Sequence, residues 1–159
     1  MVDRIDSRSR GRPKLWPVAL LRIYTGVFFA WHGFHKLSGG NFVTGMSGFL
    51  ESRLESSYGF YRPFIESVVM PNKEFFAALV SWGELAIGLA LIVGLATRYA
   101  AFAGAFLVTN FWWAKGEAVL AGSNHDFVWL VIFIVLAFVP AGRIAGLDDG
   151  LADRLPFLR

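Results

Sequence analysis

Glu84 is the residue whose type and position point most directly to chemistry. It lies within a long apolar run, about ten residues or roughly 15 Å from either end of the predicted helix, where a carboxyl group is unstable unless paired or protonated. Ser81 and Gly88 share its helical stripe, so the carboxyl group is predicted to face neighbouring helices. Arg22 and Lys36 share one stripe of an earlier helix, and either is a candidate counter-charge and ligand-binding group. Glu84 then has a ligand or proton-transfer role, or forms an ion pair that only fixes helix register.

His32 lies beside the stripe of Arg22 and Lys36 and is predicted to face inward, whereas His35 turns away toward the helix end. A neutral imidazole suits hydrogen bonding to a carbonyl or quinol oxygen and proton transfer near neutral pH. The alternative is a histidine that only satisfies core or interfacial hydrogen bonds. A three-histidine metal site would need His35 and His125 to turn toward His32, so we expect no metal.

Asn110 lies in the outer half of the third apolar run, where its amide is a candidate hydrogen-bonding group for a ligand or a neighbouring helix. Trp112 and Trp113 follow it and are typical of an aromatic belt at a membrane surface. Asn124 and Asp126 precede the fourth apolar run, where they are predicted to cap a helix and complement its dipole.

The composition places these residues in a membrane. The chain has 159 residues, of which 55% are apolar and 17% charged, and its mean hydropathy is +0.51. A soluble domain of this length has too little interior to bury so much apolar surface. Because the sequence has no cysteine, disulfides, thiolate metal sites, iron–sulfur ligation and a cysteine nucleophile are excluded. We expect the lipid bilayer around the chain and no covalent cofactor.

Four apolar runs predict four membrane-spanning helices in one domain over 15–147, at about 17–37, 75–96, 99–114 and 126–142. Small residues spaced four apart predict close packing of the second span against the third: Ala86, Ala90 and Gly94, then Ala100 and Gly104. The predicted fold class is therefore all-α, an integral membrane four-helix bundle.

The segment 38–73, between the first two spans, predicts an amphipathic insertion at the outer membrane interface. Its apolar face consists of Phe42, Met46, Phe49, Leu50 and Leu54. Its polar face consists of Ser47, Glu51, Ser52 and Glu55. The segment is either a connector that rests on the membrane or a lid over the outer mouth of the bundle.

The distribution of positive charge predicts that both termini are cytoplasmic. Ten of the fifteen Lys and Arg residues lie up to Arg22, at Arg98 or after the last span, and five are spread over two longer segments. We therefore predict a multi-pass membrane protein with cytoplasmic tails at 1–14 and 148–159. The basic start suits anionic lipid, and no nucleic-acid partner is expected. No nucleotide-binding or hydrolase motif is present.

Three groups of residues resemble the DoxX/DoxD family of small bacterial membrane proteins. They are Arg22-x3-Gly26 with His32-Gly33-x2-Lys36-Leu37, then Gly83-Glu84-Leu85-x2-Gly88-Leu89-x-Leu91-x2-Gly94-Leu95-x-Thr97-Arg98, and Ala141-Gly142-Arg143-x3-Leu147-Asp148. The resemblance implies a four-helix membrane fold and a location in the bacterial cytoplasmic (inner) membrane. It also implies an association with the small-subunit type of thiosulfate:quinone oxidoreductase, which passes electrons from sulfur compounds to membrane quinone.

Two functions are compatible with these features, and they leave open whether the chain is an enzyme. In the first, the chain is a quinone-interacting redox subunit in which Glu84 and His32 are catalytic and electrons come from a partner subunit. In the second, it is a non-catalytic scaffold or anchor of a larger membrane redox complex. The basic tail and the acidic residues Asp148, Asp149 and Asp153 would then be its contacts.

Overall fold

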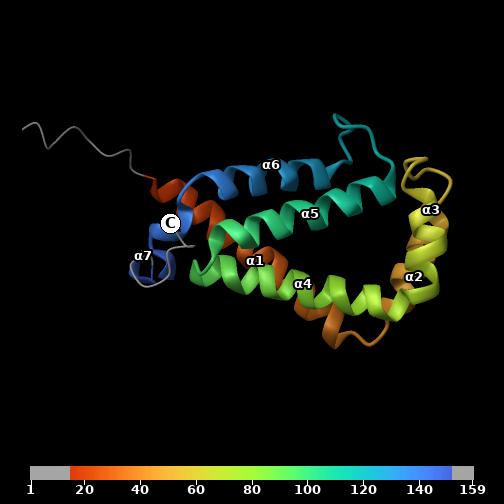
Figure 1. Cartoon of the computed structure of the whole chain (residues 1–159), viewed down its shortest axis with the longest axis horizontal. Helices are drawn as coiled ribbons and strands as arrows, with labels where there is room; N and C mark the ends of the chain where they lie inside the picture. The colour runs from red at the N-terminus through yellow and green to blue at the C-terminus, as the bar shows by residue number, and fades with distance from the viewer. Residues whose placement is uncertain (1–14, 152–159) are drawn as a thin grey trace, which may run out of the picture.

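The computed structural model describes residues 15–151, and that part of the chain is all-helical, as predicted. Four long helices run roughly side by side (Figure 1): α1 (Trp16–Ser38), α4 (Lys73–Val93), α5 (Thr97–Lys115) and α6 (His125–Phe138). The short helices α2 (Phe42–Arg53) and α3 (Arg62–Phe64) lie at one end of this bundle, and α7 (Leu147–Leu151) lies at the other. From α3, a π-helical turn (Ile65–Val69) and a 3-10 turn (Met70–Asn72) lead into α4.

The fourth long helix ends earlier than predicted, at Phe138 rather than near residue 142. Pro140 disfavours a helical conformation at the residue before it, and Val139 is accordingly extended, with ψ of 136°. A 3-10 turn, Ala141–Arg143, then leads to α7. At the other end of α6, Asn124 accepts a hydrogen bond from the Phe127 backbone N–H at 3.0 Å, which confirms the predicted cap.

The long helices form two close pairs, α1 with α4 and α5 with α6. Glycines permit the close contacts. A Cβ atom at Gly88 in α4 would lie 2.6 Å from Ala30 Cα in α1, and one at Gly26 would lie 2.8 Å from the Gly88 carbonyl oxygen. In the second pair, Gly104 lies under the ring of Phe133. Each pair therefore depends on positions where no side chain fits.

This pairing differs from the expected one. The sequence predicted closest packing between the helices now labelled α4 and α5, and these do form a hairpin, with Gly94 at φ 66° in its turn. The closest approaches made by α4, however, are to α1. Ala86 is exposed rather than packed on α5, whereas Ala90 packs against the core.

Arg22 connects distant segments of the chain at the α7 end of the bundle. Its completely buried side chain donates hydrogen bonds to the carbonyl oxygens of Ala141 at 3.1 Å and Ala145 at 2.9 Å. The guanidinium group thereby joins α1 to the segment after α6. The several N–H donors of one guanidinium group allow it to reach both carbonyl groups at once.

Asp148 adds further hydrogen bonds at the same end of the bundle. It is therefore part of the helical domain, whereas the sequence analysis began the C-terminal tail at 148. Its carboxylate accepts the backbone N–H groups of Ala96 at 2.7 Å and Thr97 at 3.1 Å, where α5 begins. Asp148 is buried, whereas Asp149 is exposed. Asp153 and the predicted basic tail, 1–14, lie outside the described residues.

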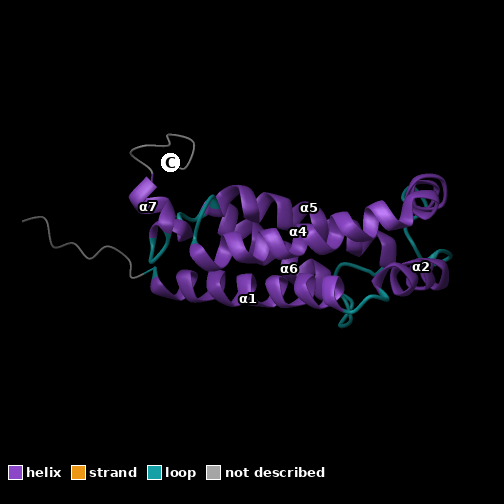
Figure 2. Cartoon of the chain, turned by 90° about the horizontal axis from the view of Figure 1, so that it is seen from below, coloured by secondary structure: helices purple, strands orange, loops and turns teal. Residues whose placement is uncertain are grey.

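The predicted insertion folds across the open end of the bundle. Figure 2, turned by 90° from Figure 1, shows α2 at the end of the bundle beyond the last turn of α1. Its buried side chains form a small second core with Ala114 at the end of α5: Leu50, Ile65 and Val69. Ser47, assigned to the polar face, is buried instead, and its hydroxyl group donates to the Thr44 carbonyl oxygen at 3.1 Å.

The outward faces of the four long helices are apolar. Large exposed side chains on these faces include Leu20, Val27, Trp82, Leu89, Phe102, Val131 and Phe138. Among the described residues, 15–151, one helical run is long and apolar enough to cross a membrane, Arg62–Val93 of 32 residues, and α6 is apolar but shorter.

Replacing Gly88 with Ala tests the role of the α1–α4 contact. The added methyl group meets the Ala30 backbone, so the helices must separate, which should cost about 1–3 kcal/mol and lower the melting temperature in detergent. Gly83→Ala is the control, because a Cβ atom there meets nothing within 4 Å. Equal melting temperatures for the two variants would contradict this account of the packing.

Candidate functional site

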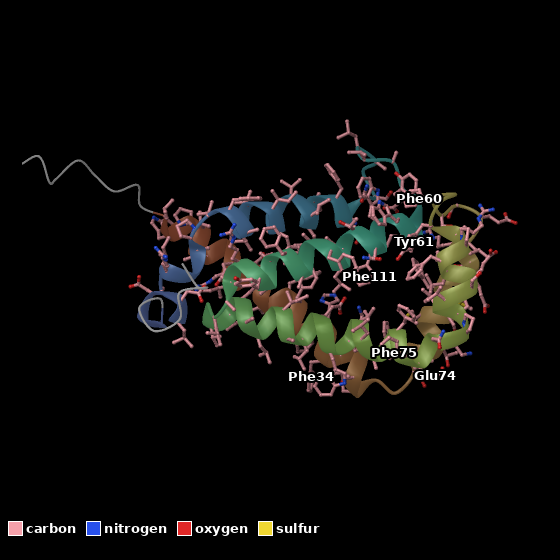
Figure 3. The ribbon with its side chains drawn as sticks, in the orientation of Figure 1. Phe34, Phe60, Tyr61, Glu74, Phe75 and Phe111 are labelled. Carbon is pink, nitrogen blue, oxygen red and sulfur yellow. The ribbon has the colours of Figure 1, made fainter. Side chains whose placement is uncertain are left out.

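A cavity of about 470 Å³ lies between the two helix pairs, beneath α2 and the segment around the π-helical turn. Its wall is mostly apolar and includes Phe42, Met46, Phe64, Val80 and Leu107. Its polar lining groups are Lys36, Tyr61, Asn110 and Lys115. Figure 3 shows Phe111 on the side of α5 that faces α4, with Tyr61 near the end of α5. Phe34 and Phe75 are exposed and do not line the cavity. The predicted insertion therefore covers a cavity rather than a closed core.

Lys36 connects this cavity to Glu84. Its ammonium nitrogen donates to Glu84 Oε1 at 2.6 Å, so Lys36 is the counter-charge among the two candidates. The Glu84 side chain is only 4% exposed, and its second oxygen, Oε2, has no hydrogen-bond partner in the part of the chain that the structure describes. Lys36 also lies over the rings of Phe42 at 4.9 Å and Phe111 at 5.4 Å. The lysine thus stands between a buried carboxylate and an apolar space.

Arg22, the other candidate, does not meet Glu84. It lies in the second turn of α1, at the end of the bundle away from the cavity, and does not line that cavity. Its guanidinium group is instead engaged with the carbonyl oxygens of Ala141 and Ala145. The geometry gives Arg22 a structural contact, not a contact with the candidate site.

A second ion pair, which the sequence analysis missed, borders the same cavity. Lys115 Nζ lies 2.7 Å from Asp126 Oδ2, an ion pair that lacks the alignment of a hydrogen bond. Lys115 ends α5 and Asp126 lies in the first turn of α6, so the pair joins these two helices. The signal was present as a lysine and an aspartate at facing helix ends, but Asp126 was assigned to capping alone.

Asn110 forms a hydrogen bond with a neighbouring segment of the chain. The sequence analysis had named a ligand or a neighbouring helix as its partner. Tyr61 donates its hydroxyl proton to Asn110 Oδ1 at 2.6 Å, and Asn110 Nδ2 donates to the Phe106 carbonyl oxygen at 2.7 Å. Burial raises the pKa of Tyr61 to about 12, so the hydroxyl group stays protonated at neutral pH. One amide hydrogen of Asn110 is not used in these bonds and is a donor for a molecule in the cavity.

The prediction that His32 faces inward was wrong: its side chain is exposed on α1 and does not line the cavity, and its catalytic role stays a prediction. Its Nδ1 lies 2.8 Å from the Phe28 carbonyl oxygen, and its ring packs on the Phe28 ring at 4.1 Å. The sequence analysis placed His32 one position from the stripe of Arg22 and Lys36. One position corresponds to about 100° around a helix, which is enough to turn the side chain outward. His35 is exposed and stacks on Trp31, and His125 is also exposed.

Within residues 15–151, no three side chains of His, Asp or Glu gather as metal ligands. Both charged lining groups are lysines, each balanced by a buried carboxylate, so the lining carries ammonium donors without a large net charge. An apolar space with a few placed donors suits an uncharged molecule that bears acceptor oxygens.

The comparisons with known proteins identify one family. The DoxX family model matches residues 18–115, which include most of α1, the α2–α3 segment, α4 and α5. No curated protein and no solved structure gave a match. The family match covers well over half of the chain and contains Lys36, Glu84, Asn110 and Lys115. The chain therefore belongs to the DoxX family.

Proposed function

We propose that this chain is a multi-pass protein of the bacterial cytoplasmic membrane that binds a quinone-type molecule in the cavity under α2. The observation that carries the proposal is the cavity itself, which is about 470 Å³ in volume, largely apolar and lined by lysine and amide donors. Sites for small organic ligands typically measure about 300–1,000 Å³ and have this mixture of apolar walls and few polar groups.

The membrane location is supported by the outward faces of the helices and by the family. DoxX proteins are generally membrane-associated. At about 1.5 Å rise per residue, the 23 residues of α1 and the 19 of α5 are each close to the thickness of a hydrocarbon core, which is about 30 Å. In this arrangement both termini face the cytoplasm, with Arg98 and Arg143 at that end. The cavity then opens toward the outer interface.

The residues around the cavity have distinct roles in holding such a molecule. Phe42 and Phe111 supply ring faces, and Lys36 and Asn110 supply hydrogen bonds to its oxygens. Glu84 holds Lys36 in position through their ion pair, and its second oxygen, Oε2, is a place where a proton can reside. When bound, a quinone accepts two electrons and two protons. We propose that the electrons come from a partner redox subunit, because the chain has no cysteine and no covalent cofactor is expected.

Filling the cavity from α2 tests ligand binding. Gly45 lines the cavity and Gly48 does not, and at both positions an added Cβ atom meets nothing within 4 Å. Gly45→Leu should weaken binding of a short-chain quinone to the purified protein at least tenfold, about 1.4 kcal/mol, because its side chain takes up ligand space. Gly48→Leu is the matched control. Saturable binding that both variants retain equally would place the ligand elsewhere.

Glu84→Gln tests the proton role, because it keeps the side chain's shape and removes its charge and its titrating proton. We expect quinone reduction by the intact complex in native membranes to fall by about a hundredfold, the lower range for loss of a general acid or base. Glu74→Gln, at an exposed position near the start of α4, is the control. If the complex falls apart instead, the scaffold function is the better account, and unchanged reduction would remove Glu84 from the mechanism.

A further inference from the structure

The cavity has two lysines, and they come from different helix pairs. Lys36 lies in the last turn of α1, in the α1–α4 pair, and Lys115 is the last residue of α5, in the α5–α6 pair. Both side chains line the cavity and are partly exposed, by 22% and 29%. The proposed function uses Lys36 and assigns nothing to Lys115.

Each lysine forms an ion pair with a buried carboxylate on the other helix of its own pair. Glu84 in α4 lies 2.6 Å from Lys36, and Asp126 in α6 lies 2.7 Å from Lys115. The two carboxylate side chains are only 4% and 8% exposed, so the lysines provide the charged groups at the cavity surface. A charge held in place by a buried partner loses little side-chain entropy when it binds a ligand, because its position is already restricted.

The balance of charge limits the ligand class. An ammonium group has three N–H donors, and the Lys36–Glu84 hydrogen bond uses one of them. Because each lysine is already paired with a carboxylate, an anionic ligand would have to compete with that carboxylate for the ammonium group. A neutral oxygen can accept a remaining N–H without displacing the carboxylate.

We propose that the cavity binds its ligand at two oxygens, one through Lys36 and one through Lys115, and that the ligand class is an uncharged ring with two carbonyl groups. This inference rests on the proposed function and deepens it. Each helix pair contributes one ion pair and one anchoring lysine, so the ligand bridges the two pairs.

Two probes separate two-point from one-point binding. 2-Methyl-1,4-naphthoquinone carries two carbonyl groups, and 2-methyl-1-tetralone keeps the fused rings with one. The quinone forms no thiol adduct with this chain, which has no cysteine. Binding of each probe is measured by calorimetry on the full chain in detergent.

Each ion pair is removed as a unit, so that no buried charge is left without a partner. One variant combines Lys36→Met with Glu84→Gln, and the other combines Lys115→Met with Asp126→Asn. Lys73→Met is the control, because Lys73 begins α4 and does not line the cavity. Melting temperatures show whether each variant is folded.

We expect each double variant to weaken binding of the dione about tenfold or more, the effect of losing a hydrogen bond to a charged group. The monoketone should bind the wild-type protein more weakly by a similar factor, and only one of the two variants should weaken it further. If the dione binds but depends on one ion pair alone, two-point binding is wrong and the proposed function stands. If the dione does not bind saturably at all, both fail.

Discussion

The close approach of α1 and α4 is the constraint on which the candidate site depends. Gly26, Gly33 and Gly88 remove the side chains that would otherwise separate these helices. The approach brings the last turn of α1 against the middle of α4, so that Lys36 reaches Glu84 at 2.6 Å. With the helices farther apart, the buried carboxylate would have no partner, which is unfavourable in an apolar interior.

The same arrangement recurs in the other half of the bundle. α5 and α6 are packed through Gly104 and Phe133 and are joined at one end by Lys115 and Asp126. Two helix pairs, each closed by an ion pair, leave a cavity between them at the end covered by α2. At the opposite end, Arg22 on α1 bonds to the segment after α6, and Asp148 bonds to backbone groups at the turn between α4 and α5. One end of the bundle is thus closed by hydrogen bonds, and the other contains a cavity beneath α2 that can hold a ligand.

Much of the fold could be predicted because it follows from local patterns. Apolar length and helix-ending residues located the four long helices, and the burial of Glu84 followed from its place in an apolar run. The pairing of helices could not be predicted, because small residues occur on several faces and only the tertiary structure selects α1 as the partner of α4. The inward orientation predicted for His32 was wrong because an offset of one position along a helix is enough to turn a side chain from the interior to the exterior. Lys115 and Asp126 were missed because they come from different elements and meet only in three dimensions.

Photoaffinity labelling tests most directly whether the cavity between the helix pairs holds a quinone. A quinone with a photoreactive azide is irradiated with the protein in native membranes, and the labelled peptides are mapped by mass spectrometry. The account predicts labels on α2 and α5, at lining residues such as Met46 and Leu107, which an excess of unlabelled quinone suppresses. Labels confined to the outward faces of α1 and α6, around Leu20 and Val131, and insensitive to unlabelled quinone would contradict it.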